Sequence, residues 1–239
     1  MEHSSTVRCC DMTSCAVSIL AALLLIGSAH AEVLFYGGDF NPSFWYSDSL
    51  SNENDAAVHG DPYGSAVYQN FVIPDGQSWS VSALFSNNIM TLTPTSAYWE
   101  IRTGVSEGSG GNLLASGAGI DNSHLKGAFD EYTNTINGLD LTLGPGQYWF
   151  TVVPQAPGQQ GRSSNTNTFG QNSVGTQMTD QQYFNSPFFG YNFTTAGDFG
   201  VFPIFSDGVM GTVVPEPASL IMMASGLLTV AGILRRRLL

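Results

Sequence analysis

Short runs of aromatic and β-branched residues occupy the middle of the chain, and clusters of Gly, Pro, Asn, Asp and Ser separate them. Short strands at such spacing, with turn residues between them, are typical of an antiparallel sandwich. No stretch of the body keeps a helical hydrophobic period over several turns. We therefore predict an all-β body, a single antiparallel β-sandwich, with strands at 67–73, 79–85, 97–103, 113–117, 139–143, 148–153 and 201–205.

Hydrophobic and polar positions alternate within several of these runs. In 79–85 the odd-numbered positions are apolar, and Ser80 and Ser82 lie between them. In the next run Trp99 and Ile101 share one side, whereas Glu100 and Arg102 share the other. Because successive strand residues point to opposite faces, each run should cover a core with one face and meet water with the other.

Two connecting segments have distinct compositions. Gly144-Pro145-Gly146 places proline and glycine at the second and third positions of a type II turn, directly before the aromatic run at 148–153. The stretch 154–182 is rich in Gln, Asn, Gly, Ser and Thr. We predict that this stretch is a long surface excursion.

The first strongly apolar run, 16–29, has 14 residues. That length is too short to span a bilayer and is typical of a signal-peptide core. Ala29 and Ala31 supply the small residues of an A-x-A cleavage site, so we expect cleavage after Ala31; a buried helix is the alternative. All three cysteines precede the run, which argues against a lipoprotein anchor, and a start at Met12 would remove two acids from the leading segment.

The second apolar run, 218–234, holds 17 uncharged residues. At 1.5 Å per residue it reaches roughly 25 Å, the lower limit for a membrane-spanning helix. Arg235, Arg236 and Arg237 follow at once. Clustered arginines mark the cytoplasmic side and extend a span by reaching the headgroups, so we predict a transmembrane helix with the body on the opposite side. A core helix is the alternative.

Pro215, Glu216 and Pro217 stand just ahead of this run. Proline lacks an amide proton and keeps the preceding residue out of helical geometry. The segment is therefore expected to be extended, as a protease or transpeptidase substrate is; a plain helix stop is the alternative.

The order Pro-Glu-Pro, short apolar helix, arginine cluster and chain end resembles the PEP-CTERM sorting signal of Gram-negative bacteria that make exopolysaccharide. The resemblance covers 213–239 and implies recognition through Pro215, Glu216 and Pro217 by exosortase, a membrane-embedded enzyme that resembles cysteine proteases. It also implies export, transient anchoring in the inner membrane, and then a place at the cell surface or in the extracellular matrix. The expected organisation is a signal peptide at 1–31, a sandwich at 32–212 and a sorting tail at 213–239.

The middle of the chain is also similar to the jelly-roll-like bodies of many exosortase-sorted proteins. The similarity lies in the motifs at 98–104, 111–117 and 139–149 and covers roughly 67–153. It implies a fold and no catalytic residues.

Charge is concentrated in the body and is acidic. The chain has a net charge of −12, and 16 of its 19 acidic residues but only three basic residues lie within 32–214. Such a balance opposes binding to phosphate backbones, so no nucleic-acid partner is expected.

Candidate catalytic residues are few. Gly104-Val105-Ser106-Glu107-Gly108 matches the G-x-S-x-G elbow of hydrolases, but that elbow leads into a helix, whereas a Gly/Ser loop and a predicted strand follow here. His59 and His124 lie in polar, turn-like contexts and are predicted to be surface residues.

Oxygen ligands for a metal ion are more plentiful than histidines. Calcium takes six to eight oxygens, which the loops of a sandwich can supply. The sequence thus allows a structural calcium, with solvated loop acids as the alternative, and no other cofactor is expected. The candidate acids are Asp39, Asp48, Asp55, Asp61, Asp130, Glu131 and Asp198.

Adjacent aromatic residues offer a possible contact with sugars. In a strand, one ring of such a pair should face the core and its neighbour should face outward, where it could stack on a sugar ring. The alternative is that all of them serve the core. The pairs are Trp45-Tyr46, Tyr98-Trp99, Tyr148-Trp149 and Phe188-Phe189.

Taken together, the residues favour a non-enzymatic secreted or surface protein, sorted by exosortase and associated with the exopolysaccharide or biofilm matrix. A secreted carbohydrate-binding module is the first alternative, and a secreted hydrolase is a weaker one.

Overall fold

The computed structural model describes residues 31–40, 49–53, 64–120, 123–125, 130–159, 161–215 and 225–226. Nearly all of the regular structure in these residues is β-strand, in agreement with the predicted all-β class. The strands are β1 (Glu32–Tyr36), β2 (Ser49–Ser51), β3 (Ala66–Ile73), β4 (Gln77–Met90), β5 (Ser96–Thr103), β6 (Asn112–Gly119), β7 (His124–Leu125), β8 (Glu131–Leu143), β9 (Gly146–Gln155), β10 (Ser163–Thr166), β11 (Tyr183–Ser186), β12 (Tyr191–Thr195) and β13 (Asp207–Pro215), with one 3₁₀ turn, η2 (Ala196–Phe199).

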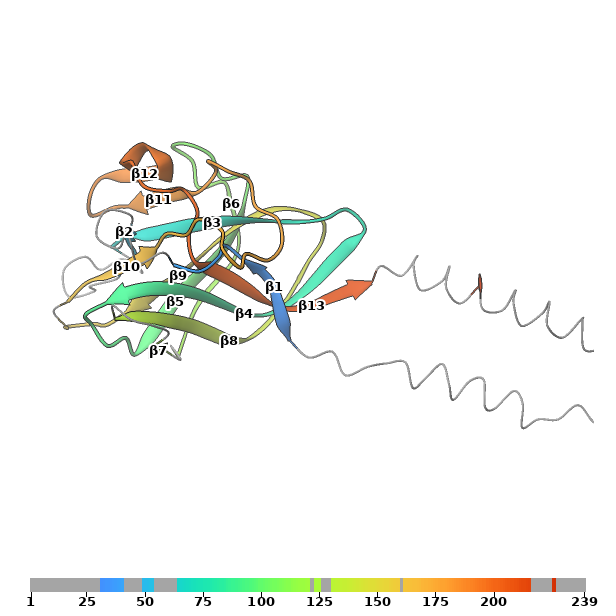
Figure 1. Ribbon diagram of the computed structural model, residues 1–239, viewed down its shortest axis with the longest axis horizontal. Coiled ribbons are helices and arrows are strands. Elements are labelled where there is room, and N and C mark those ends of the chain that lie inside the picture. Colours follow the sequence, from blue (N-terminus) through green and yellow to red (C-terminus); the bar gives the residue numbers. More distant parts are fainter. Residues whose placement is uncertain are drawn as a thin grey trace, which may run out of the picture. The chain divides into compact units, whose positions relative to one another are not determined.

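The strands form two sheets in which every named pairing is antiparallel. The first sheet has the order β1-β13-β4-β10-β2, in which β13 and β10 pair with successive parts of one edge of β4. The opposite edge of β4 pairs with β8, and β7 lies beyond β8. The second sheet has the order β12-β11-β3-β9-β5-β6. The first and last strands of the body, β1 and β13, thus lie side by side (Figure 1).

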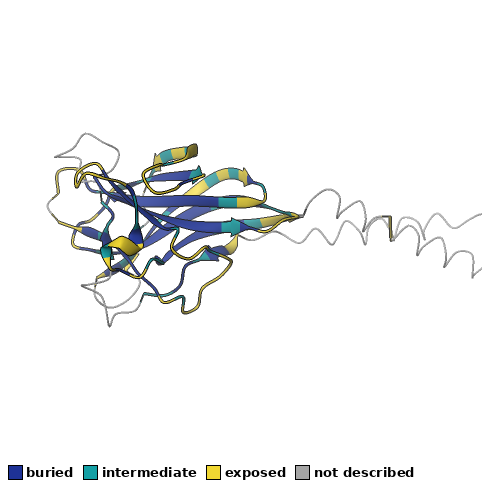
Figure 2. Ribbon diagram, turned by 90° about the horizontal axis from the view of Figure 1, so that it is seen from above, coloured by how far each residue is buried: buried dark blue, intermediate teal, exposed yellow. Residues whose placement is uncertain are grey.

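The two sheets pack face to face around an apolar core, and the long strands are buried over most of their length (Figure 2). Phe71 lies at its centre, stacked on Trp79 of the facing sheet with the ring centroids 5.5 Å apart and on Tyr148 of its own sheet at 5.5 Å. Trp99 and Ile101 point into this core, as their alternation predicted.

The alternation in β4 is broken by a bulge. Against β13, Val81 and Ala83 stand opposite the consecutive residues Gly211 and Met210, so Ser82 is the extra residue of β4. A bulge adds one residue to a strand, so that beyond it the even-numbered positions face the core where the odd-numbered positions did before. Leu84, rather than Ala83 or Phe85, therefore continues the core-facing row of Trp79 and Val81, and the prediction that the odd positions of 79–85 share one face is wrong beyond the bulge.

Two predicted segments differ from the structure. The stretch 154–182 is not a surface excursion throughout, because β10 lies within it, pairs with β4 and β2, and has Ser163, Asn165 and Thr166 fully buried. Residues 201–205 form no strand; Pro203 has no amide proton to donate, and only Phe205 makes an isolated bridge, to Asn167. The C-terminal strand begins later, at Asp207.

The turn between β8 and β9 keeps the predicted use of glycine in a different geometry. Gly146 has φ +144°, a value that side-chain-bearing residues rarely adopt, rather than the value near +80° of a type II turn. The Tyr148 hydroxyl donates a hydrogen bond of 3.0 Å to the Gly144 carbonyl and closes the turn from the strand side.

A carboxyl group is buried at the start of β13. Asp207 is 1% exposed, and the side-chain amide of Asn165 donates to both of its oxygens, at 2.9 and 2.8 Å. Burial raises the pKa of Asp207 from 3.8 to about 8, against the opposing effect of Asn165 and of the Asn87 backbone amide. Its side-chain partner Asn165 is neutral, so the folded protein favours the protonated form at neutral pH.

The raised pKa makes stability depend on pH. The folded state holds the Asp207 proton more tightly than the unfolded state, so its stabilising effect is complete below pH 4 and is lost as the pH rises toward 8. This single group should lower the free energy of unfolding by about 1 kcal/mol for each pH unit within that window.

We predict that Asp207→Asn removes this decline. Denaturant unfolding from pH 4 to pH 9 measures it, and Asp140→Asn, at an exposed position, controls for the loss of one negative charge. The expected result is a flatter pH profile for Asp207→Asn alone. Parallel profiles for the wild type and Asp207→Asn would show that the buried carboxyl does not titrate as described.

Candidate functional site at the C-terminal strand

The last strand of the sandwich continues directly into the Pro-Glu-Pro segment. β13 pairs with β4 along its whole length, and its final residues Val213, Val214 and Pro215 lie opposite Trp79, Ser78 and Gln77. Pro215 is thus the last residue of the ladder as well as the first residue of the predicted sorting motif.

The end of β13 is paired on one side and open on the other within the described residues. β1 pairs with β13 only from Glu32, opposite Gly211, to Tyr36, opposite Gly208. Beyond Gly211 the described partner of β13 is β4 alone. Val213 and Val214 are accordingly 41% and 40% exposed, although their backbone belongs to the sheet.

Two glycines allow β13 to lie this close to its neighbours. A Cβ atom at Gly208 would stand 2.2 Å from Cζ of Phe85, and one at Gly211 would stand 2.0 Å from the Ser80 carbonyl oxygen. Gly211 also stands at the register shift, opposite the bulge that Ser82 makes in β4. Since glycine usually signals a turn, these residues explain why the sequence pattern did not reveal this strand.

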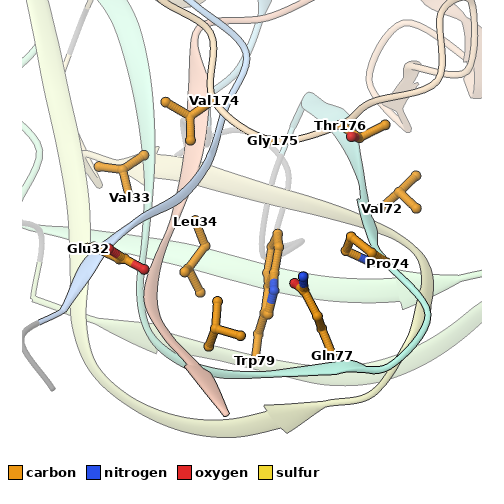
Figure 3. Close-up of a pocket in the computed structure, with 11 residues that line it drawn as sticks. Glu32, Val33, Leu34, Val72, Pro74, Gln77, Trp79, Val174, Gly175 and Thr176 are labelled. Carbon is orange, nitrogen blue, oxygen red and sulfur yellow. The ribbon is translucent and has the colours of Figure 1, made fainter. Parts of the chain in front are cut away.

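A cavity of ≈ 360 Å³ lies beside this end of the sandwich. Apolar side chains dominate its lining, and Trp79 stands between Leu34 and the Gln77 side chain (Figure 3). The Trp79 indole nitrogen is buried without a hydrogen-bond partner. The lining residues are Glu32, Val33, Leu34, Val72, Pro74, Gln77, Trp79, Val174, Gly175, Thr176 and Val213.

Most of the predicted sorting residues lie outside the described residues. Pro215 closes β13, and Ala31, the predicted last residue of the signal peptide, directly precedes β1. Within the predicted spanning run, Ser225 and Gly226 are helical. No helix in the described ranges is long and apolar enough to cross a membrane. The residues outside them are Ala29, Glu216, Pro217, Arg235, Arg236 and Arg237.

In the two described strand pairs one ring faces the core and its neighbour faces the outer side of the sheet, as predicted, but the outward ring is covered and not open to a sugar. Tyr148 and Trp149 are both buried, because the outer face of the second sheet has its own apolar cluster with Tyr68, Tyr183 and Phe193. Trp99 is buried, whereas Phe188 and Phe189 are both exposed. The pair Trp45-Tyr46 lies outside the described residues.

Glu100 and Arg102 do face away from the core, as predicted, but the same outer cluster covers them. Glu100 is paired with Arg102 and accepts hydrogen bonds from the hydroxyls of Tyr68 at 2.8 Å and Tyr98 at 2.7 Å. The Arg102 guanidinium lies 5.4 Å from the ring centroid of Phe193. This arrangement joins β3, β5 and β12 and leaves Glu100 buried, so we assign it a structural role.

Ser106, the serine of the G-x-S-x-G match, lies in a tight hairpin between two strands. Ser106 and Ser109 exchange backbone hydrogen bonds of 3.0 and 2.8 Å across Glu107 and Gly108. Glu107 in turn accepts bonds from the backbone and hydroxyl of Thr195, at 2.6 and 2.7 Å. The elbow of a hydrolase leads from a strand into a helix, whereas this hairpin leads from β5 into β6.

Other candidate ligands are dispersed. His124 is exposed on β7, and Asp39 accepts hydrogen bonds from Tyr36 at 2.8 Å and Asn172 at 2.7 Å. Among the described residues, no group of three or more His, Cys, Asp or Glu side chains is placed to hold a metal ion. Asp48, Asp55, Asp61 and His59 lie outside them, so the expectation of a structural calcium stays a prediction.

Comparison with known proteins identifies the C-terminal segment. Residues 213–237 match the model of the PEP-CTERM protein-sorting motif. The match begins at Val213, so its first three residues are the last three of β13. No curated protein matches the chain. The chain therefore carries a PEP-CTERM sorting motif, as its sequence predicted.

We predict that Gly211→Ala destabilises the body by about 2 kcal/mol or more, because the new Cβ meets backbone that has no room to move aside. Gly144→Ala is the matched control, since its Cβ would meet nothing within 4 Å. Denaturant unfolding of the two variants measures the difference. Equal stability of Gly211→Ala and Gly144→Ala would contradict the close approach of β13 to β4.

Proposed function

We propose that this chain is a non-enzymatic exported protein of a Gram-negative bacterium that exosortase processes at its C-terminal motif and that acts in the exopolysaccharide or biofilm matrix. The PEP-CTERM motif implies exosortase-dependent sorting, with export and membrane anchoring before processing. The final location at the surface or in the matrix, and the role there, are the proposed steps.

The observation that carries the proposal is the direct passage from β13 into the motif. The N-terminal end of β1 and the C-terminal end of β13 are neighbours, because Glu32 lies opposite Gly211. The site predicted for signal cleavage and the motif therefore both adjoin one end of the sandwich. A body attached at one end can be released or transferred by a single cut in its tail.

We also propose that the sandwich is a jelly roll, the body type that the sequence resembles. The eight strands with the most extensive pairing form two sheets in the orders β1-β13-β4-β8 and β3-β9-β5-β6. Consecutive strands alternate between the two sheets, except for the hairpin β5-β6, and the first and last strands are adjacent. This order is that of two Greek keys wrapped into a double sheet.

Charge supports a matrix role without binding of anionic polymers. The body carries 16 acids against three basic residues. One of those three, Arg102, is paired with Glu100 under the outer aromatic cluster. An acidic body repels acidic polysaccharides and nucleic acids, so its neighbours in a matrix would be neutral polymers, cations or other proteins.

A second candidate function, a carbohydrate-binding module, is favoured by exposed aromatic rings at the turn between β11 and β12. Phe188, Phe189 and Tyr191 are 54%, 50% and 41% exposed, and the rings of Phe188 and Phe189 lie 4.6 Å apart. We call these three residues the β11–β12 aromatic patch. The described tryptophans are all buried, so this patch replaces them as the candidate sugar platform.

We predict that Glu216→Ala or Pro217→Ala leaves an unprocessed precursor in the inner membrane of cells that contain exosortase. Prolines favour an extended segment, and the carboxylate of Glu216 would pair with a positive group on the enzyme. Replacing Arg235, Arg236 and Arg237 together by neutral residues should instead impair orientation and retention.

Fractionation and the mass of the released form measure these effects, with Thr212→Ser as a control just outside the motif. Normal cutting and release of both Glu216→Ala and Pro217→Ala would overturn the sorting function and leave a plain single-pass anchor.

For the carbohydrate alternative we predict that the double variant Phe188→Ala, Phe189→Ala loses at least about fivefold in affinity for a neutral glycan, since a stacking platform contributes about 1 kcal/mol or more. Phe202→Ala removes a similarly exposed ring, which packs on Phe169, and serves as the control. Glycan-array binding measures it. Absence of binding by the wild type, or equal loss in both variants, would exclude this patch.

A further inference from the structure

We infer that the folded sandwich sets the N-terminal limit of exosortase cleavage, so that the peptide bond that is cut lies C-terminal to Pro215. This inference rests on the proposed function, because it concerns where exosortase acts on the tail. It goes beyond that function by assigning part of the matched motif to the body and the remainder to the enzyme.

The motif is divided by the end of the β13–β4 ladder. Val213, Val214 and Pro215 belong to the matched motif and also pair with Trp79, Ser78 and Gln77. An enzyme that cuts a peptide bond must reach the extended backbone around that bond from both edges of the strand. The β4 side of these three residues is already occupied by the sheet, so a bond within them is out of reach while the strand stays paired.

Releasing those residues becomes harder with each step toward the body. Val213 lines the cavity beside Trp79 and Leu34, so lifting it exposes that apolar lining. From Gly211 inward, β13 is paired with β1 as well as with β4. Opening further would unpair the central strand of three and expose Val209, which is fully buried in the core.

The order of export supports the same limit. β13 is the last strand of the body and lies between β1 and β4, so the first sheet is incomplete until β13 has crossed the membrane. Once Pro215 has crossed, the sandwich can close and hold it. Exosortase then meets a folded body whose paired strand extends to Pro215.

A two-residue deletion tests this limit. Removing Val213 and Val214 moves Pro215 and Glu216 to the positions opposite Trp79 and Ser78. Strand positions two apart direct their backbone groups to the same side. The shifted prolines therefore stand at positions whose backbone faces the same way as that of Pro215 in the wild type. The substitution pair Val213→Thr, Val214→Thr is the control, because it changes the same side chains and keeps the length of the chain.

In cells that contain exosortase, the wild type should yield a mature C-terminus at Pro215 or later, read by mass spectrometry of the intact released protein. The deletion should slow processing by about tenfold or more, because cutting then depends on the rare opening of the strand. The length-matched control should be processed within about twofold of the wild type, as expected for exposed valines that are replaced without a change of register. Protease resistance of each body shows that it has folded.

The outcomes separate this inference from the proposed function. A mature C-terminus before Pro215, or processing of the folded deletion variant at the wild-type rate, would overturn the limit while exosortase sorting stands. A wild-type chain that exosortase does not cut would overturn the sorting function and this inference together.

Discussion

The pairing of β13 with β4 is the interaction on which the other features of the body depend. β4 is the longest strand and pairs with β8 on its other edge, so β13 extends the sheet that carries half of the core. β1 has β13 as its named partner and supplies Leu34 and Phe35 to that core. Without β13, these apolar residues would lose the strand that holds them in place, and the first sheet would end at β4.

The same strand joins the stability of the body to the chemistry of the tail. Asp207 at its beginning is buried and has a raised pKa. Gly211 in its middle has no space for a side chain, and Pro215 at its end belongs to the sorting motif. A strand with these constraints tolerates little change in register. The position of the motif relative to the folded body is therefore fixed within the described residues, which is the basis of the cleavage limit that we propose.

Local patterns predicted what depends on neighbouring residues. The runs at 67–73, 97–103 and 148–153 correspond closely to β3, β5 and β9, because β-branched and aromatic residues dominate them. The sorting motif was also predictable, since its parts follow one another in the chain.

What the sequence did not predict depends on distant contacts. β13 contains two glycines that are needed because Phe85 and Ser80 approach its backbone closely. β10 is polar, although it is buried, because it pairs with the polar end of β4 around Asn88. The outer cluster that covers Trp149 and Glu100 joins residues from β3, β5, β9, β11 and β12, which no local pattern reveals. For the same reason the cavity beside Val213 could not be anticipated.

Hydrogen exchange of the backbone amides tests most directly whether β13 is part of the body up to the motif. The measurement compares deuterium uptake in the segment 207–215 with uptake in 77–86, its partner in β4. The account predicts slow exchange in both segments, with the amides before Gly211 slowest because strands pair on both sides there. Exchange throughout 212–214 as fast as at the exposed turn of Asp75 and Gly76 would contradict it, because the motif would then begin outside the sheet.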